Sequence, residues 1–173
     1  MLSDTEIMEF KKFAFEYFPP PVGFSPTETE LYWEPTLKDA KDPSDLEPML
    51  MNPLDALMLK QPTFIFCLPA YMVGGLKWRV FAIDSIFYLL YTPGTPWDAW
   101  NPDDWRRQFA AWDSLMMQLS YPQKRVIRVW LELMALSHPT REMSDDYRST
   151  DALAEQVKVM LANYWGSYDR LPG

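Results

Sequence analysis

A stripe of apolar residues opens the chain: Ile7, Phe10, Phe13, Ala14, Tyr17 and Phe18. Steps of three and four residues place these side chains on one face of an amphipathic helix. Ser3 and Glu6 have the spacing of a capping box, which predicts the start of this helix. Three prolines at 19–21 predict its end, because proline supplies no amide donor and disfavours helix in the residue before it.

The pattern is different over residues 19–53, which hold eight of the sixteen prolines. Seven acidic and two basic residues there account for five of the eight net negative charges. We expect an extended or irregular segment on the surface. Four apolar side chains in its middle are expected to pin it to the rest of the protein: Leu31, Tyr32, Trp33 and Leu37.

A second helix is predicted from Asn52 and Pro53, a cap followed by a proline, up to Gln61 and Pro62. Residues 63–91 are the most apolar part of the chain and should form the core. Their spacing favours a helix, although residues 78–83 also have the aromatic and β-branched content of a strand. A turn is expected at residues 92–96, where proline and glycine cluster.

Three further helices are predicted in the second half of the chain. Asn101 and Pro102 repeat the signal of a cap followed by a proline, and Ser120 with Gln123 forms another capping-box pair. The long helix after Ser120 has the apolar stripe Ile127, Trp130, Leu131 and Met134, and His138 with Pro139 ends it. The last helix has the stripe Leu153, Val157, Met160, Leu161, Tyr164 and Trp165 and is closed by Gly166.

These elements predict a mostly α protein in which residues 1–173 form one compact helical bundle. The proline-rich acidic segment, residues 19–53, is expected to pack on the surface of that bundle. The chain is long enough for one domain, and its 48% of hydrophobic residues can supply a core.

A formal charge of −8 limits the classes of partner. Nucleic-acid binding is not expected, because contacts with phosphates need a surplus of Lys and Arg. A basic protein partner would be attracted, although many proteins are acidic for solubility alone. One cysteine, an acidic start, and no apolar run as long as a membrane span lead us to expect a cytoplasmic protein.

The side chains of catalysis are scarce, with one histidine, one cysteine and six glycines in 173 residues. The phosphate-binding, zinc-binding and nucleophile motifs are all absent from the sequence. The acidic doublets at 103–104 and 145–146 are neighbours in sequence, so their side chains do not face each other on a helix. We therefore expect no catalytic residues, no cofactor and no metal.

Three single residues have both a structural and a chemical interpretation. Cys67 lies among large apolar residues, where a thiol is normally buried, protonated and inert. His138 follows a predicted helix and suits a C-terminal cap better than a base paired with Cys67. Asp84, alone in an apolar run, is most easily interpreted as a helix cap, with a buried ion pair to an arginine as the alternative.

Tryptophan residues give the clearest indication of binding. Trp105 and Trp112 have the spacing of core residues, whereas Trp97 and Trp100 lie in a predicted loop beside acids. Such loop aromatics are either anchors for a basic partner or a cover for the core. The candidate partner-binding residues are Trp97, Asp98, Trp100, Asp103, Asp104, Glu28, Glu30 and Glu34.

Four blocks of sequence, in this order, resemble a bacterial family of unknown function: IMEFKKFAFEYFPPP, FCLPAYM, IDSIFYLL and LSYPQKRVIRVWLELM. That family is marked by a central L-P-A-Y-M element, here residues 68–72, and a later helix that starts Leu-Ser/Thr-x-x-Gln. The resemblance implies an α-rich fold and a bacterial origin, and it carries no catalytic residues. In the L-P-A-Y-M element we expect Pro69 to begin a helical turn, and Tyr71 and Met72 to pack while the tyrosine hydroxyl finds a partner.

Together these features predict a non-enzymatic binding protein, specifically an immunity or inhibitor protein that neutralises a basic toxin or effector. A structural or regulatory subunit of a larger assembly is the first alternative. The second is a hydrolase based on Asp and Glu, whose site uses only Asp, Glu, Tyr and Arg side chains, with a pocket that gathers Asp84 and either Arg79 or Glu132.

Overall fold

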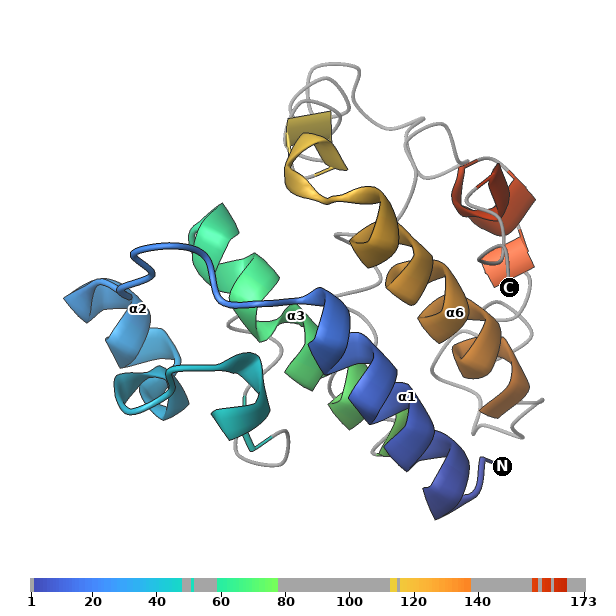
Figure 1. The fold of residues 1–173 in the computed structure, drawn as a ribbon, viewed down its shortest axis with the longest axis horizontal. Coiled ribbons are helices and arrows are strands. Elements are labelled where there is room, and N and C mark those ends of the chain that lie inside the picture. The colour runs from blue at the N-terminus through green and yellow to red at the C-terminus, as the bar shows by residue number, and fades with distance from the viewer. Residues whose placement is uncertain are drawn as a thin grey trace, which may run out of the picture. The chain divides into compact units, whose positions relative to one another are not determined.

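A computed structural model of the chain describes residues 2–47, 51, 59–77, 113–114, 116–137, 157–158, 160–162 and 164–167. The described residues are mostly helical and include no strand, which confirms the mostly α fold (Figure 1). The chain divides into two compact units, Met1–Phe87 and Tyr88–Gly173, and each is described by itself. The single domain remains a prediction.

Helix α1, Asp4–Tyr17, begins and ends where the sequence predicts. The Ser3 amide donates to the Glu6 carboxylate at 2.7 Å, and the Glu6 amide donates to the Ser3 hydroxyl at 3.3 Å. These two bonds satisfy backbone groups that a helix start leaves without partners. From the predicted stripe, Ile7, Phe10, Ala14 and Phe18 are buried. Helix α1 packs against α3 within the first unit (Figure 1).

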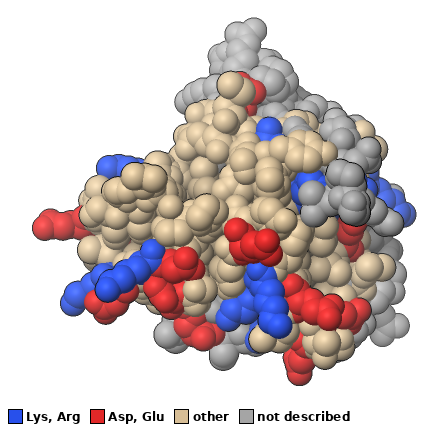
Figure 2. Space-filling model, in the orientation of Figure 1, with Lys and Arg blue, Asp and Glu red and all other residues tan. Residues whose placement is uncertain are grey.

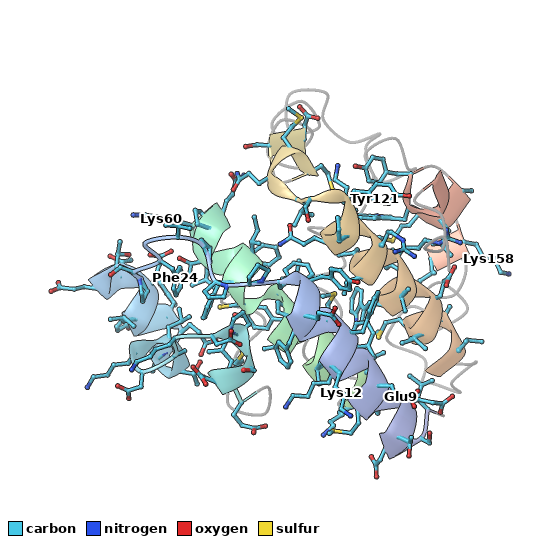
Figure 3. All side chains as sticks on the ribbon, viewed as in Figure 1. Glu9, Lys12, Phe24, Lys60, Tyr121 and Lys158 are labelled. Carbon is cyan, nitrogen blue, oxygen red and sulfur yellow. The ribbon has the colours of Figure 1, made fainter. Side chains whose placement is uncertain are left out.

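A tight turn follows the three prolines. The amide of Phe24 donates to the carbonyl of Pro21 at 3.0 Å, and Gly23 has a φ of +71°. Side chains other than glycine rarely adopt this left-handed conformation, so the turn requires Gly23. Phe24 then stacks on Phe66 with ring centroids 4.1 Å apart, which holds the turn against α3 (Figure 3).

The acidic segment is more ordered than the sequence predicts. It contains helix α2, Glu28–Trp33, and two short 3-10 helices, η1, Pro35–Lys38, and η2, Pro43–Asp45. Leu37 is buried as expected, but Tyr32 is 76% exposed and does not pin the segment. The prediction of an irregular segment missed α2 because its capping signal, Thr27 followed by Glu30, lies among prolines.

Helix α3, Gln61–Lys77, is buried along most of its length. The sequence predicts a helix end at Gln61 and Pro62, but α3 starts there, and a proline in the first turn costs no hydrogen bond. Pro69 lies inside α3 and does not begin a turn. It removes the amide that would bond the Ile65 carbonyl, and packing on all sides of the helix offsets that loss. Residues 52–58 and 78–112, with their predicted helix, strand alternative and turn, lie outside the described residues.

The second unit contains the predicted long helix, α6, Tyr121–Ser137. The Ser120 amide donates to the Gln123 side chain at 2.9 Å, and the Gln123 amide donates to the Ser120 hydroxyl at 3.4 Å. The predicted stripe is completely buried: Ile127, Trp130, Leu131 and Met134. Both the capping box and the inner face of this helix are thus confirmed.

Helical residues near the end of the chain lead into a 3-10 turn, η5, Trp165–Ser167. The predicted inner residues Val157, Met160 and Trp165 are buried. A Cβ atom on Gly166 would lie 2.3 Å from the Leu161 carbonyl oxygen, so only glycine fits this close approach. Across the described parts of both units, the helices fall short of the length and apolarity needed to cross a membrane.

Candidate functional site

The negative charge of the protein is concentrated at its start. Residues 1–47 contain 11 acidic and four basic residues, a net charge of −7 out of −8 for the whole chain. The remaining residues are therefore nearly neutral. Because this region belongs to the first unit, that unit is the acidic one.

Most of these carboxylates lie at the surface. Within residues 2–47 the exposed acids are Asp4, Glu6, Glu9, Glu16, Glu28, Asp39, Asp45 and Glu47. Lys12, Lys38 and Lys41 are the exposed bases of the same range. On the face drawn in Figure 2, acidic and basic side chains are interspersed, as Glu9 and Lys12 on α1 illustrate (Figure 3). The surface is thus acidic through an excess of exposed carboxylates.

Glu30 is a buried carboxylate that caps two helices at once. Its Oε2 atom accepts from the Thr27 amide at 2.9 Å and the Thr27 hydroxyl at 2.7 Å, at the start of α2. Its Oε1 atom accepts from the Lys60 amide at 3.0 Å, at the start of α3. Both helix starts present amide donors and positive dipole ends, which is where a carboxylate is most favourable. Glu30 therefore joins α2 to α3.

The surroundings of Glu30 keep it ionised. Burial alone would raise the pKa of this carboxyl, since its side chain is only 2% exposed. Hydrogen bonds from the Thr63 side chain, from Thr27 and from the Lys60 amide outweigh burial and lower the pKa to about 2. The charged form is thus the one that the fold stabilises.

Glu34 is the second buried carboxylate, and it is the residue that caps the C-terminal end of α2. Its Oε2 atom accepts from the Tyr71 hydroxyl at 3.3 Å, and its Oε1 atom accepts from the Thr36 hydroxyl. Tyr71 and Met72 on α3 are buried, as predicted, and the tyrosine hydroxyl has the partner that the sequence analysis expects. Glu34 thus gives α2 and α3 a second connection.

The side chains of α2 divide between the interior and the surface at a spacing of four residues. Glu30 and the C-terminal cap Glu34 are buried, whereas Glu28 and Tyr32 are exposed. Glu28 and Tyr32 are four residues apart within the helix, so they share its outward face. This short segment thus has two buried carboxylates with a structural role, Glu30 and Glu34. It also has an exposed carboxylate next to an exposed aromatic ring, Glu28 and Tyr32.

Cys67 is a buried, unreactive thiol. Its side chain is 0% exposed and forms no disulfide. Burial, and then the negative charges of Glu34 and Glu30, raise the pKa of the thiol well above its ordinary value. The thiolate is the nucleophilic form, so Cys67 does not supply one at neutral pH.

Only three of the candidate partner-binding residues lie in the described part of the chain. Glu28 is at the surface, while Glu30 and Glu34 are buried and bonded within the fold. Those two carboxylates are therefore placed to hold α2 on α3, not to meet a partner. Trp97, Asp98, Trp100, Asp103 and Asp104 lie outside the described residues.

The residues of the hydrolase alternative are mostly outside the described part as well. This applies to Arg79 and Asp84. His138, which the sequence analysis weighs as a helix cap or as a base for Cys67, also lies outside the described residues. Glu132 forms an ion pair with Arg128 on the same helix, at 3.1 Å. Among the described residues, no three histidine, cysteine or acidic side chains are grouped so as to hold a metal ion.

Sequence reasoning missed two parts of this arrangement. The capping box of Thr27 and Glu30 has the usual spacing and could have been found from the sequence. The contact between Glu34 and Tyr71 joins residues 37 positions apart and has no local signal.

Comparison with known proteins adds no relative: no family model, no curated protein and no solved structure matches the chain. The resemblance carried by residues 68–72 therefore stays a prediction.

Proposed function

We propose that this chain is a non-enzymatic binding protein that neutralises a basic partner, as an immunity or inhibitor protein does. The observation that supports the proposal best is the charge of the first unit, −7 within residues 1–47, with most of its carboxylates exposed. A partner with a surplus of Lys and Arg would complement this surface.

The exposed carboxylates would act mainly on the encounter with the partner. Charges of opposite sign raise the association rate, and salt screens this effect over about 8–10 Å at ordinary ionic strength. Lysines are interspersed among the acids. The partner would therefore bind in the orientation that places its basic groups opposite the acids and its acidic groups opposite the lysines.

Tight binding would also need desolvated anchors. Trp97 and Trp100 remain the proposed aromatic anchors, with Asp98, Asp103 and Asp104 close to them in the sequence. We place the protein in the cytoplasm of a bacterium, where it would protect its own cell from the partner.

The experiment that tests this proposal starts in the native host. The full chain is tagged and purified with its partner, the partner is purified separately, and the affinity of the two is measured between 50 and 500 mM salt. We expect a basic partner whose binding weakens as salt rises. We also expect that the partner, when expressed alone, arrests growth and that this chain relieves the arrest.

A charge variant and its control make the test specific. The triple substitution Glu28→Gln, Asp39→Asn and Glu47→Gln should slow association and flatten the salt dependence. Asp113 is an exposed acid of the second unit, and Asp113→Asn should change neither the association rate nor its salt dependence. An acidic or neutral partner, or a partner whose effect on growth this chain does not relieve, would contradict the proposal.

A further inference from the structure

The outward face of α2 combines a carboxylate with an exposed aromatic ring. Glu28 and Tyr32 are four residues apart on this helix, so their Cβ atoms are about 5–6 Å apart. Glu28 is exposed, and 76% of the Tyr32 side chain is open to solvent. The carboxylate and the ring are therefore both accessible to a ligand.

The ring of Tyr32 is supported by its neighbour. Tyr32 and Trp33 pack edge to face, with centroids 5.1 Å apart and planes at 84°. This contact limits the motion of the ring without covering it. Less conformational entropy is therefore lost when a ligand binds against the ring.

Elsewhere in the chain, a cationic side chain pairs with a carboxylate or an aromatic ring four residues away. Arg128 pairs with the Glu132 carboxylate at 3.1 Å, and the Lys11 ammonium lies 5.5 Å from the centre of the Phe15 ring. Within the part of the chain that the structure describes, neither Glu28 nor Tyr32 has such a cationic partner. The Glu28 carboxylate and the Tyr32 ring are thus adjacent and exposed, and no cationic side chain of the described residues is bound to them.

We propose that Glu28 and Tyr32 together receive one basic side chain of the protein partner, with arginine preferred. A guanidinium group can stack on the tyrosine ring and donate hydrogen bonds to the carboxylate at the same time. Lysine has a more strongly hydrated, compact charge and gains less from the ring. The inference rests on the proposed function, since it locates one contact with the basic partner.

Two substitutions measure separately how much the ring and the carboxylate contribute to the affinity for the partner. We expect Tyr32→Leu, which keeps an apolar side chain but removes the ring, to weaken binding of the purified partner about tenfold. Glu28→Gln should weaken it to a similar degree, and Tyr32→Phe should stay within about twofold because the ring face remains. The matched controls are Glu9→Gln and Tyr121→Leu, which change an exposed acid on α1 and a half-exposed tyrosine of the second unit.

The same contact can be tested without the partner. The full chain with ring-labelled tyrosine is titrated with a (Gly-Arg)4 peptide, and with (Gly-citrulline)4 as an uncharged match. We expect saturable shifts of the Tyr32 ring signals with the arginine peptide only, and their loss in Glu28→Gln. Equal shifts with both peptides, or no shift of Tyr32, would overturn the inference.

The outcomes also distinguish the two proposals. If the partner binds, but Tyr32→Leu and Glu28→Gln bind as tightly as the unchanged chain, the cation contact is wrong and the proposed function stands. If the purified partner is not basic, both proposals fall. Unfolding curves of each variant exclude loss of the fold as the cause of weaker binding.

Discussion

The Oε1 atom of Glu30 accepts a 3.0 Å hydrogen bond from the amide of Lys60, thirty residues further along the chain. The other carboxylate oxygen caps the start of α2 at Thr27. A single side chain therefore satisfies donors of two helix starts, and the acidic segment is held to α3 by an internal charge.

Glu30→Gln should destabilise the first unit by about 2 kcal/mol, because an amide group places donors where the fold needs acceptors. Urea unfolding of the full chain measures this loss. Glu28→Gln is the matched control, since Glu28 is also in the first turn of α2 but is exposed. It should change stability by no more than about 0.5 kcal/mol. Equal losses in both variants would contradict the double-cap role of Glu30.

Acid should weaken the fold through the same side chain. The pKa of Glu30 is lowered from its ordinary value of 4.5 to about 2, so its contribution is complete above pH 4.5. It is lost as the pH falls from 4.5 to about 2, and amounts to about 3 kcal/mol.

Urea unfolding at a series of pH values between 2 and 6 measures this dependence. Stability of the unchanged chain should fall more steeply than that of Glu30→Gln, and the two curves should converge near pH 2. Parallel curves over the whole range would show that Glu30 does not carry this contribution.

Cys67 should resist thiol reagents in the native chain. Burial and the nearby charges of Glu34 and Glu30 raise the pKa of the thiol, so the reactive thiolate is scarce and covered. Reaction with a chromogenic disulfide at pH 8 should be slow and become fast in urea, where the chain unfolds. Rapid reaction in the absence of urea would show that this part of the first unit opens readily.

Two glycine substitutions should destabilise the protein for different reasons. Gly166→Ala places a Cβ atom 2.3 Å from the Leu161 carbonyl oxygen, and we expect a loss of about 2 kcal/mol or more from this overlap. Gly23→Ala meets no atom within 4 Å, but it forces a side chain into a φ of +71°. That strain should cost about 1 kcal/mol.

Thermal unfolding of the two glycine variants beside the unchanged chain measures both losses. A neutral Gly166→Ala would mean that the turn at residues 165–167 relaxes without cost.

The sequence by itself determined the starts and the buried faces of α1 and α6. The paired caps of Ser3 with Glu6 and of Ser120 with Gln123 involve residues three apart, and the buried stripes of α1 and α6 follow the helical repeat. Such features depend on neighbours in the chain, so sequence spacing is sufficient to locate them.

The candidate site depended on the tertiary structure. Glu28, Glu30 and Glu34 are all glutamates in the sequence, and only the tertiary contacts around α2 decide that the last two are buried while the first is exposed. Their partners Lys60 and Tyr71 lie 30 and 37 positions away. The position of Pro69 inside α3 was decided in the same way, because burial around the helix outweighs the hydrogen bond that proline removes. Solvation of a side chain is a property of everything packed around it, and distant segments supply most of that surrounding.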